Sequence, residues 1–133
     1  MFVKGVGMTK FSTENRSSQQ MIYEAVWEAL EDAEMSLNKI EGIVVTNIDL
    51  FWNGERQRHS ASMINSILNT KVPVIRVIAG CGGGGNALWT GQNIEYNNVL
   101  VIGFEKLVAG TNRSRTDEIL MGGERIYEQS EGM

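Results

Sequence analysis

The sequence predicts a layered α/β fold in which helices pack on a mostly parallel, mixed sheet. Short apolar runs rich in β-branched residues alternate along the chain with segments whose apolar residues recur at helical spacing. Such alternation is typical of strand-helix-strand units, which place successive strands parallel to one another. The run at residues 40–49 is apolar almost throughout, as expected for a strand that is buried on both faces of a parallel sheet.

Length and composition limit the classes of protein to consider. The chain has 133 residues, of which 42% are hydrophobic, so one domain with one core is expected. The net charge of −4 is modest and the basic residues are scattered, which argues against nucleic acid as a partner. One cysteine excludes an internal disulfide, and one histidine argues against a zinc site. The N-terminus lacks the long apolar run of a signal peptide or a membrane helix, so we expect a cytoplasmic protein.

The first two elements are a strand and an amphipathic helix. Residues 2–11 alternate between apolar and small or polar residues, and the glycines there mark places where another element packs closely. Ser17 or Ser18 caps the helix, which we expect to end near Met35. One stripe of this helix is apolar: Met21, Ile22, Ala25, Val26, Ala29, Leu30 and Ala33. The opposite face is acidic, and we assign it to solvent, without chemistry: Glu24, Glu28, Glu31 and Asp32.

The middle of the chain repeats the same alternation, and the signal fades after it. The predicted elements are a strand at 40–49, a loop at 50–58, a helix at 60–69, a strand at 74–78 after Pro73, a helix at 85–96 and a strand at 98–104. Residues 108–115 are polar and typical of a loop, and residues 119–123 show no sustained period. The last residues contain no stop signal for any element, so we expect the chain to be incomplete.

The only cysteine lies in a glycine-rich turn between a strand and a helix. The turn reads Gly80-Cys81-Gly82-Gly83-Gly84-Gly85. The first N–H groups of a helix have no intrahelical acceptor and its dipole is positive there, which favours the thiolate form of a cysteine. The glycines allow a tight turn and leave the sulfur uncovered. Cys81 is therefore a candidate nucleophile for attack on carbonyl carbon.

Two other interpretations of this turn stay open. Cys81 could be a small core residue, because free cysteine is among the most buried residue types. Alternatively, Gly80, Gly82 and Gly85 spell the G-x-G-x-x-G pattern of a dinucleotide-binding module, with Glu105 placed where a ribose-binding acid is expected. Against the second interpretation, the motif follows two earlier strand-helix units instead of opening the fold.

Three stretches, in this order, support a named family. Residues 3–11 are similar to an opening strand of the form G-x-G-x-T-x-F, residues 78–88 to a nucleophile turn and its helix, and residues 99–107 to a strand that ends in a V-G-x-E-K-like signature. Together they resemble the N-terminal part of the thiolase superfamily, and more closely its archaeal acetyl-CoA acetyltransferase and sterol-carrier-protein thiolase branch. The resemblance covers nearly the whole chain.

The resemblance implies an acyltransferase that uses acyl-CoA thioesters, in Claisen condensation or in thiolytic cleavage of 3-ketoacyl-CoA. Cys81 would accept the acyl group, and the backbone of Gly80, Gly82, Gly83 and Gly84 would shape the turn and its oxyanion site. Coenzyme A thioester would be the substrate, with no permanently bound cofactor. The family also implies a five-stranded sheet and a dimer formed through strands near the nucleophile.

The sequence also departs from the family. Thiolases are much longer, and their second half supplies a catalytic histidine and a second cysteine. The sole histidine here, His59, lies in a different context, and we interpret it as structural. We therefore expect residues 1–133 to form one domain without the C-terminal half, inactive alone and active only with a complementary C-terminal-half polypeptide. Apolar surface left bare by the missing half also predicts a homo-oligomer. The alternatives are a non-catalytic acyl-CoA-binding or scaffold partner and the dinucleotide-binding module.

Overall fold

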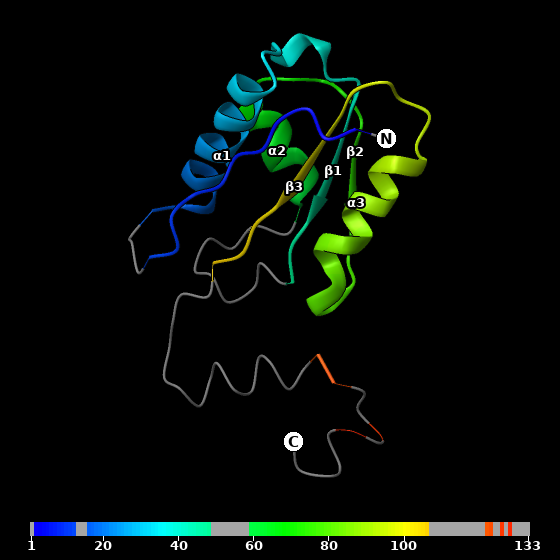
Figure 1. The fold of residues 1–133 in the computed structure, drawn as a ribbon. Helices are drawn as coiled ribbons and strands as arrows, with labels where there is room; N and C mark the ends of the chain where they lie inside the picture. The colour runs from blue at the N-terminus through cyan, green and yellow to red at the C-terminus, as the bar shows by residue number, and fades with distance from the viewer. Residues whose placement is uncertain are drawn as a thin grey trace.

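The computed structural model describes residues 2–12, 16–48 and 59–106, together with residues 122, 123, 126 and 128. Within these residues, three parallel strands form one sheet in the order β2-β1-β3 (Figure 1). Their bounds are Gly42–Thr46 for β1, Val74–Val77 for β2 and Val99–Gly103 for β3. The predicted α/β class with a parallel sheet is confirmed. The described residues contain three of the five strands that the resemblance implies.

The central strand β1 is buried on both faces, as its continuous apolar run predicts. All five of its residues are buried, and Val44 lies in register between Ile75 of β2 and Val101 of β3. Alternate side chains of a strand point to opposite faces, so a strand with apolar side chains on both faces needs a cover on each side. Helices provide that cover on both faces of the sheet (Figure 1).

Helices α1 (Ser18–Asp32) and α2 (Ser60–Leu68) pack on one face of the sheet. Their buried side chains form a single cluster with the strands: Ile22, Val26, Leu30, Ile40, Ile43, Val45, Met63, Ile64, Leu68, Leu100 and Ile102. The stripe predicted for α1 is therefore the buried one. A capping box fixes the start of α1, because the Ser17 hydroxyl accepts from the Gln20 N–H (3.1 Å) and the Gln20 side chain accepts from the Ser17 N–H (2.9 Å).

Helix α3 (Gly83–Asn93) covers the other face, and small residues allow its close approach. Ala87 is fully buried, and a Cβ atom at Gly91 would lie 2.9 Å from Val101 Cγ2. The helix begins two residues before the predicted start at 85 and ends three residues before 96. The shift has a physical reason, because Gly83 and Gly84 lack the apolar side chains from which the helical period is recognised.

The N-terminal segment, residues 2–12, differs from its prediction. It is extended but belongs to no strand, and it lies against α1. A Cβ atom at Gly5 would lie 2.3 Å from the Ala29 carbonyl oxygen, and one at Gly7 would lie 2.0 Å from that of Ala25. The prediction of a sheet strand is therefore wrong for these residues, whereas the prediction that the glycines mark close packing is confirmed.

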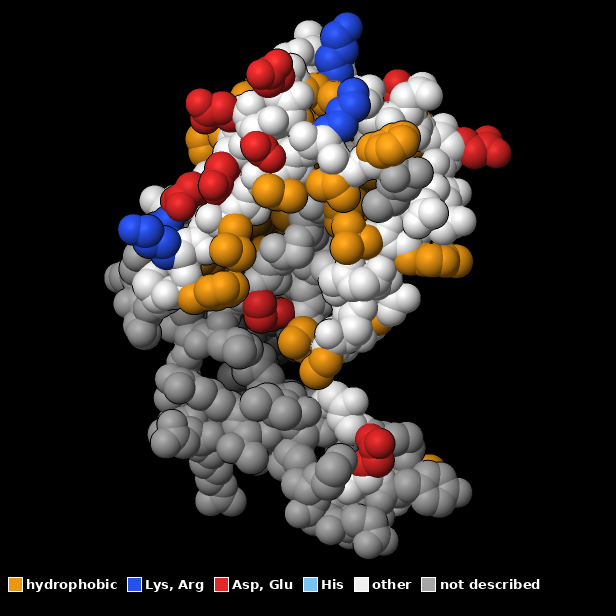
Figure 2. Space-filling model, in the orientation of Figure 1, with side chains coloured by type: hydrophobic (Ala, Val, Ile, Leu, Met, Phe, Trp, Pro, Cys, Tyr) orange, Lys and Arg blue, Asp and Glu red, His pale blue; other side chains and the backbone are white. Residues whose placement is uncertain are grey.

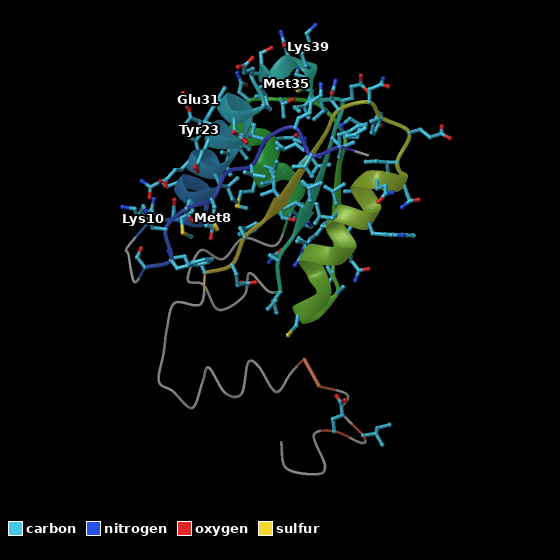
Figure 3. The ribbon with its side chains drawn as sticks, in the orientation of Figure 1. Met8, Lys10, Tyr23, Glu31, Met35 and Lys39 are labelled. Carbon is cyan, nitrogen blue, oxygen red and sulfur yellow. The ribbon has the colours of Figure 1, made fainter. Side chains whose placement is uncertain are left out.

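Two carboxylates of α1 hold this segment. The Val6 N–H donates to Asp32 (2.8 Å) and the Met8 N–H donates to Glu28 (2.9 Å). Figure 2 shows the acidic side chains along α1, and Figure 3 shows Met8 beside that helix and Glu31 pointing away from the sheet. All four acidic residues of α1 are exposed, so the predicted solvent-facing position of this face is confirmed. Two of them, Glu28 and Asp32, in addition hold the N-terminal segment, which was not predicted.

The remaining element predictions differ from the structure at their ends or lie outside it. The helix expected to reach Met35 ends at Asp32, and a short 3₁₀ helix at Leu37–Lys39 was not predicted. The predictions for 50–58 and for most of the chain after 106 fall outside the described residues. A search of the described residues for a helix of membrane-spanning length and apolarity finds none.

Candidate functional site

The candidate nucleophile Cys81 lies at the carboxyl end of the sheet, in the connection from β2 to α3. A short 3₁₀ helix at Gly80–Gly82 forms the turn, in which the Gly82 N–H donates to the Ala79 carbonyl at 2.9 Å. Gly80 has a φ of +48°, a left-handed conformation that favours glycine. The thiol is exposed, so the alternative of a buried core cysteine is wrong.

The start of α3 leaves backbone donors available beside Cys81. Its N-cap residue is Gly82, which provides no side-chain cap, and the first turn contains no acidic residue. Within the described part of the chain, the Cys81 N–H has no hydrogen-bond acceptor. Unpaired N–H groups at a helix start can bind an anion or a developing oxyanion.

The glycines of the turn differ in what surrounds them. Gly83 is buried, and a Cβ atom there would lie 2.5 Å from Thr46 Oγ1, so α3 needs this glycine to approach β1. A Cβ atom at Gly80, Gly84 or Gly85 would meet nothing within 4 Å. The absent side chains at 84 and 85 therefore leave open space in the first turn of α3, which follows the Cys81 turn directly.

Polar groups gather where β1 and its neighbours end. The buried Asn47 accepts, through Oδ1, a hydrogen bond from Arg76 Nε at 3.0 Å. The Ile48 N–H donates to a carboxylate oxygen of Glu105 at 2.6 Å. Neither Asn47 nor Arg76 was predicted as a site residue, although an asparagine directly after an apolar run and an arginine inside one were available signals. One oxygen of Glu105, considered above for a ribose, serves to hold the chain after β1.

His59 belongs to a different element from the Cys81 turn. His59 precedes α2 at the N-cap position, where its side chain makes no capping hydrogen bond, and it is exposed. The helix it precedes covers the face of the sheet opposite to α3. A search of the described residues finds no group of three or more histidine, cysteine, aspartate or glutamate side chains that could hold a metal ion.

Exposed apolar side chains lie before the turn and farther along α3. Ile78 is 63% exposed, Leu88 49% and Trp89 65%. A surface hollow does exist elsewhere, lined by Ser17, Gln19, Gln20, Tyr23, Glu24 and Ile67, and Cys81 does not contribute to it. The Cys81 turn is thus an open surface with exposed apolar side chains on either side of it in the sequence.

Comparison with known proteins gives partial matches. Sterol carrier protein 2 of Bos taurus is 32% identical over 117 residues, which are 83% of this chain and 21% of that protein. The beta-ketoacyl-[acyl-carrier-protein] synthase III of Staphylococcus haemolyticus is 28% identical over 125 residues, which are 89% of this chain and 39% of that protein. No protein-family model matches the chain.

A solved structure agrees with these relatives. The 3-oxoacyl-[acyl-carrier-protein] synthase III of Aquifex aeolicus superposes with a TM-score of 0.60 and 28% identity, over 71% of this chain and 31% of that one. The chain therefore spans about a fifth of the length of the sterol carrier protein relative and about a third of the synthase. Over this shared region, the chain is similar in sequence and fold to proteins of the thiolase-like superfamily.

Proposed function

We propose that the chain carries the acyl-accepting part of a thiolase-like acyltransferase that uses acyl-CoA thioesters, with Cys81 as the nucleophile. The observation that carries the proposal is the placement of Cys81. It is an exposed thiol between the carboxyl end of a parallel strand and the start of a helix without a side-chain cap, in a chain similar to proteins of the thiolase-like superfamily.

The proposed chemistry is acyl transfer through a covalent intermediate. The Cys81 thiolate attacks the thioester carbonyl carbon, a new carbon–sulfur bond forms, and the bond to the coenzyme A sulfur breaks. Coenzyme A leaves as the thiolate and takes up a proton. The Cys81 N–H is suited to stabilise the oxyanion of the tetrahedral intermediate, and Gly80 and Gly82 to Gly84 form the turn that presents this amide. No resident cofactor is needed.

Completion of the reaction requires groups beyond this region. Proton transfer needs a base or acid within hydrogen-bond reach of the reacting atoms, and the one histidine of the chain precedes a helix on the other face of the sheet. The exposed apolar side chains before the turn and in α3, Ile78, Leu88 and Trp89, favour a further polypeptide or a second copy over this surface. We infer that turnover depends on such an assembly in the cytoplasm, without nucleic acid or membrane as a partner.

The test is transfer of an acyl group to Cys81. The protein is incubated with acetyl-CoA or acetoacetyl-CoA, alone and with candidate complementary chains, and intact mass and peptide mapping locate any acetyl group. We expect one acetyl group on Cys81 and none in Cys81→Ala. Equal labelling of the two proteins would refute the proposal. We also expect iodoacetamide to alkylate Cys81 faster than a model thiol at neutral pH.

The second candidate is a non-catalytic acyl-CoA-binding or scaffold role. It is favoured by the single cysteine of the sequence and by the position of His59 relative to the sheet. In that case Cys81→Ala binds acyl-CoA as tightly as the natural protein, and no complementary chain restores transfer. The dinucleotide-binding alternative predicts quenching of Trp89 fluorescence by a dinucleotide and not by acetyl-CoA.

A further inference from the structure

The chain directly after β1 is held from both neighbouring strands. On one side, Arg76 of β2 donates through Nε to Asn47. On the other side, Glu105, two residues beyond the end of β3, accepts the Ile48 N–H. The Phe104 N–H also donates to the Thr46 carbonyl at 3.1 Å. Contacts from both sides thus converge on residues 46–48.

The contact with Arg76 fixes the orientation of the Asn47 amide. An arginine side chain offers only donors, so the amide oxygen of Asn47 must face the guanidinium. Asn47 is 6% exposed, and its Nδ2 is buried without a partner among the described residues. The bond from Arg76 is therefore the polar contact that holds this buried side chain in place.

Residues 46–48 in turn support the first turn of α3. Gly83 packs directly on Thr46, at a distance that leaves no room for a side chain. The Gly83 N–H donates to Gly80, so Cys81 lies inside the turn that rests on Thr46. Arg76 is also close to the turn in the sequence, because β2 ends at Val77 and the chain then leads into the turn.

We propose that Arg76 and Glu105 are positioning residues for Cys81, and that they act through Asn47, Ile48 and Thr46. This inference rests on the nucleophilic role proposed for Cys81, and it assigns the two charged residues to that same site. Arg76 orients Asn47 and Glu105 anchors the Ile48 amide. Together they keep the segment under Gly83 in one place, and with it the backbone amides around the sulfur.

The experiment measures the turn without any acyl-CoA. Amide hydrogen exchange is followed by NMR at Gly82, whose N–H is bonded to Ala79, and alkylation of Cys81 by iodoacetamide is timed at one fixed pH. Arg76→Met and Glu105→Ala remove the contacts, whereas Arg76→Lys keeps a charged donor and Glu105→Gln keeps an acceptor. Lys71→Met is the matched control, because Lys71 is an exposed cation before the amino end of β2.

We expect Arg76→Met and Glu105→Ala to speed exchange at Gly82 by roughly tenfold, the factor that corresponds to the loss of one hydrogen bond, and to slow alkylation several-fold. Arg76→Lys and Glu105→Gln should recover most of both values, and Lys71→Met should leave both unchanged. Exchange at Val44, in the centre of the sheet, serves as the readout of global opening and should not change.

The opposite results would overturn the proposal. Exchange at Gly82 and alkylation equal to the natural protein in both Arg76→Met and Glu105→Ala would show that the turn is independent of these residues. If amide exchange at Val44 accelerated by the same factor as at Gly82, Arg76 and Glu105 would contribute only to global stability. Where Arg76→Met does not fold, Asn47→Ala removes the same contact and is judged by the same outcomes. Because no acyl-CoA is used, acyl transfer to Cys81 can fail or succeed independently of this test.

Discussion

Helices α1 and α3 pack on opposite faces of the sheet, and they begin in opposite ways. Helix α1 starts with a capping box formed by Ser17 and Gln20, which gives acceptors to its first N–H groups. Helix α3 starts at a glycine run, without a side-chain cap and without an acidic residue in its first turn. Both helices supply buried residues to the core, so the difference is confined to their N-terminal ends.

The stability of the helix alone does not explain the sequence at the start of α3. A side-chain cap adds about 0.5–2 kcal/mol, and each glycine in a helix costs about 1 kcal/mol relative to alanine. Packing explains Gly83, but a side chain at Gly84 or Gly85 would meet nothing in the described chain. The helix start without a cap is the one beside the exposed Cys81, as expected if the open space and the Cys81 amide serve a ligand.

The largest expected effect is that of a side chain at the one buried glycine of the α3 start. Gly83→Ala should destabilise the protein by about 1–3 kcal/mol, because its Cβ would collide with Thr46 Oγ1. Urea unfolding monitored by circular dichroism measures the change. Thr46→Ala removes the colliding oxygen, so the double variant should recover part of the loss. A Gly83→Ala protein as stable as the natural one would show that α3 does not rest on Thr46.

The second prediction removes the cap from α1. Ser17→Ala should lower stability by about 1 kcal/mol, because the Gln20 N–H loses its acceptor. Ser17→Asp, which retains a side-chain acceptor, should restore most of that stability. The same unfolding measurement applies. No loss in Ser17→Ala would mean that the capping box contributes nothing and that the contrast between the two helix starts has no energetic basis.

Most of the sheet and its helices could be predicted from the sequence, because buried positions carry apolar residues at the spacing of a strand or a helix. The strand β1 contains a continuous apolar run and α1 has a regular apolar stripe, so both could be located within a few residues. The segment 2–12 could not be placed. An extended segment with alternating large and small residues can pack on a helix as well as join a sheet. The contact between Gly7 and Ala25 of α1 becomes apparent only in the folded structure.

The candidate site was predictable in part for a similar reason. Cys81 could be identified because the turn around it is local in sequence, so strand, glycines and helix appear side by side. The bond between Arg76 and Asn47 joins residues 29 positions apart and depends on how β2 lies beside β1. Nothing in either residue alone indicates its partner. Long-range polar contacts of this kind require the register of the sheet.

The third prediction adds side chains at the open glycines. Gly84→Ala and Gly85→Ala should each stabilise the protein by about 0.5–1 kcal/mol, because alanine restricts the unfolded chain and its Cβ meets no atom. If the open space receives a ligand, the same variants should slow the reaction of Cys81 relative to the natural protein. The slowing should be greater for a bulky maleimide than for iodoacetamide. Equal effects on the two reagents would show that these glycines leave no functionally relevant space.

The smallest expected effect concerns the carboxylates of α1. Glu28→Ala and Asp32→Ala should each cost about 0.5 kcal/mol, because each removes one solvent-exposed hydrogen bond to the N-terminal segment. Amide exchange should accelerate at Met8 in the first variant and at Val6 in the second, while Val44 stays protected. Glu31→Ala is the matched control, because Glu31 lies on the same helix and points away from the sheet (Figure 3). If Glu31→Ala accelerated exchange at Val6 and Met8 equally, the general charge of α1 would hold the segment, and not the two hydrogen bonds.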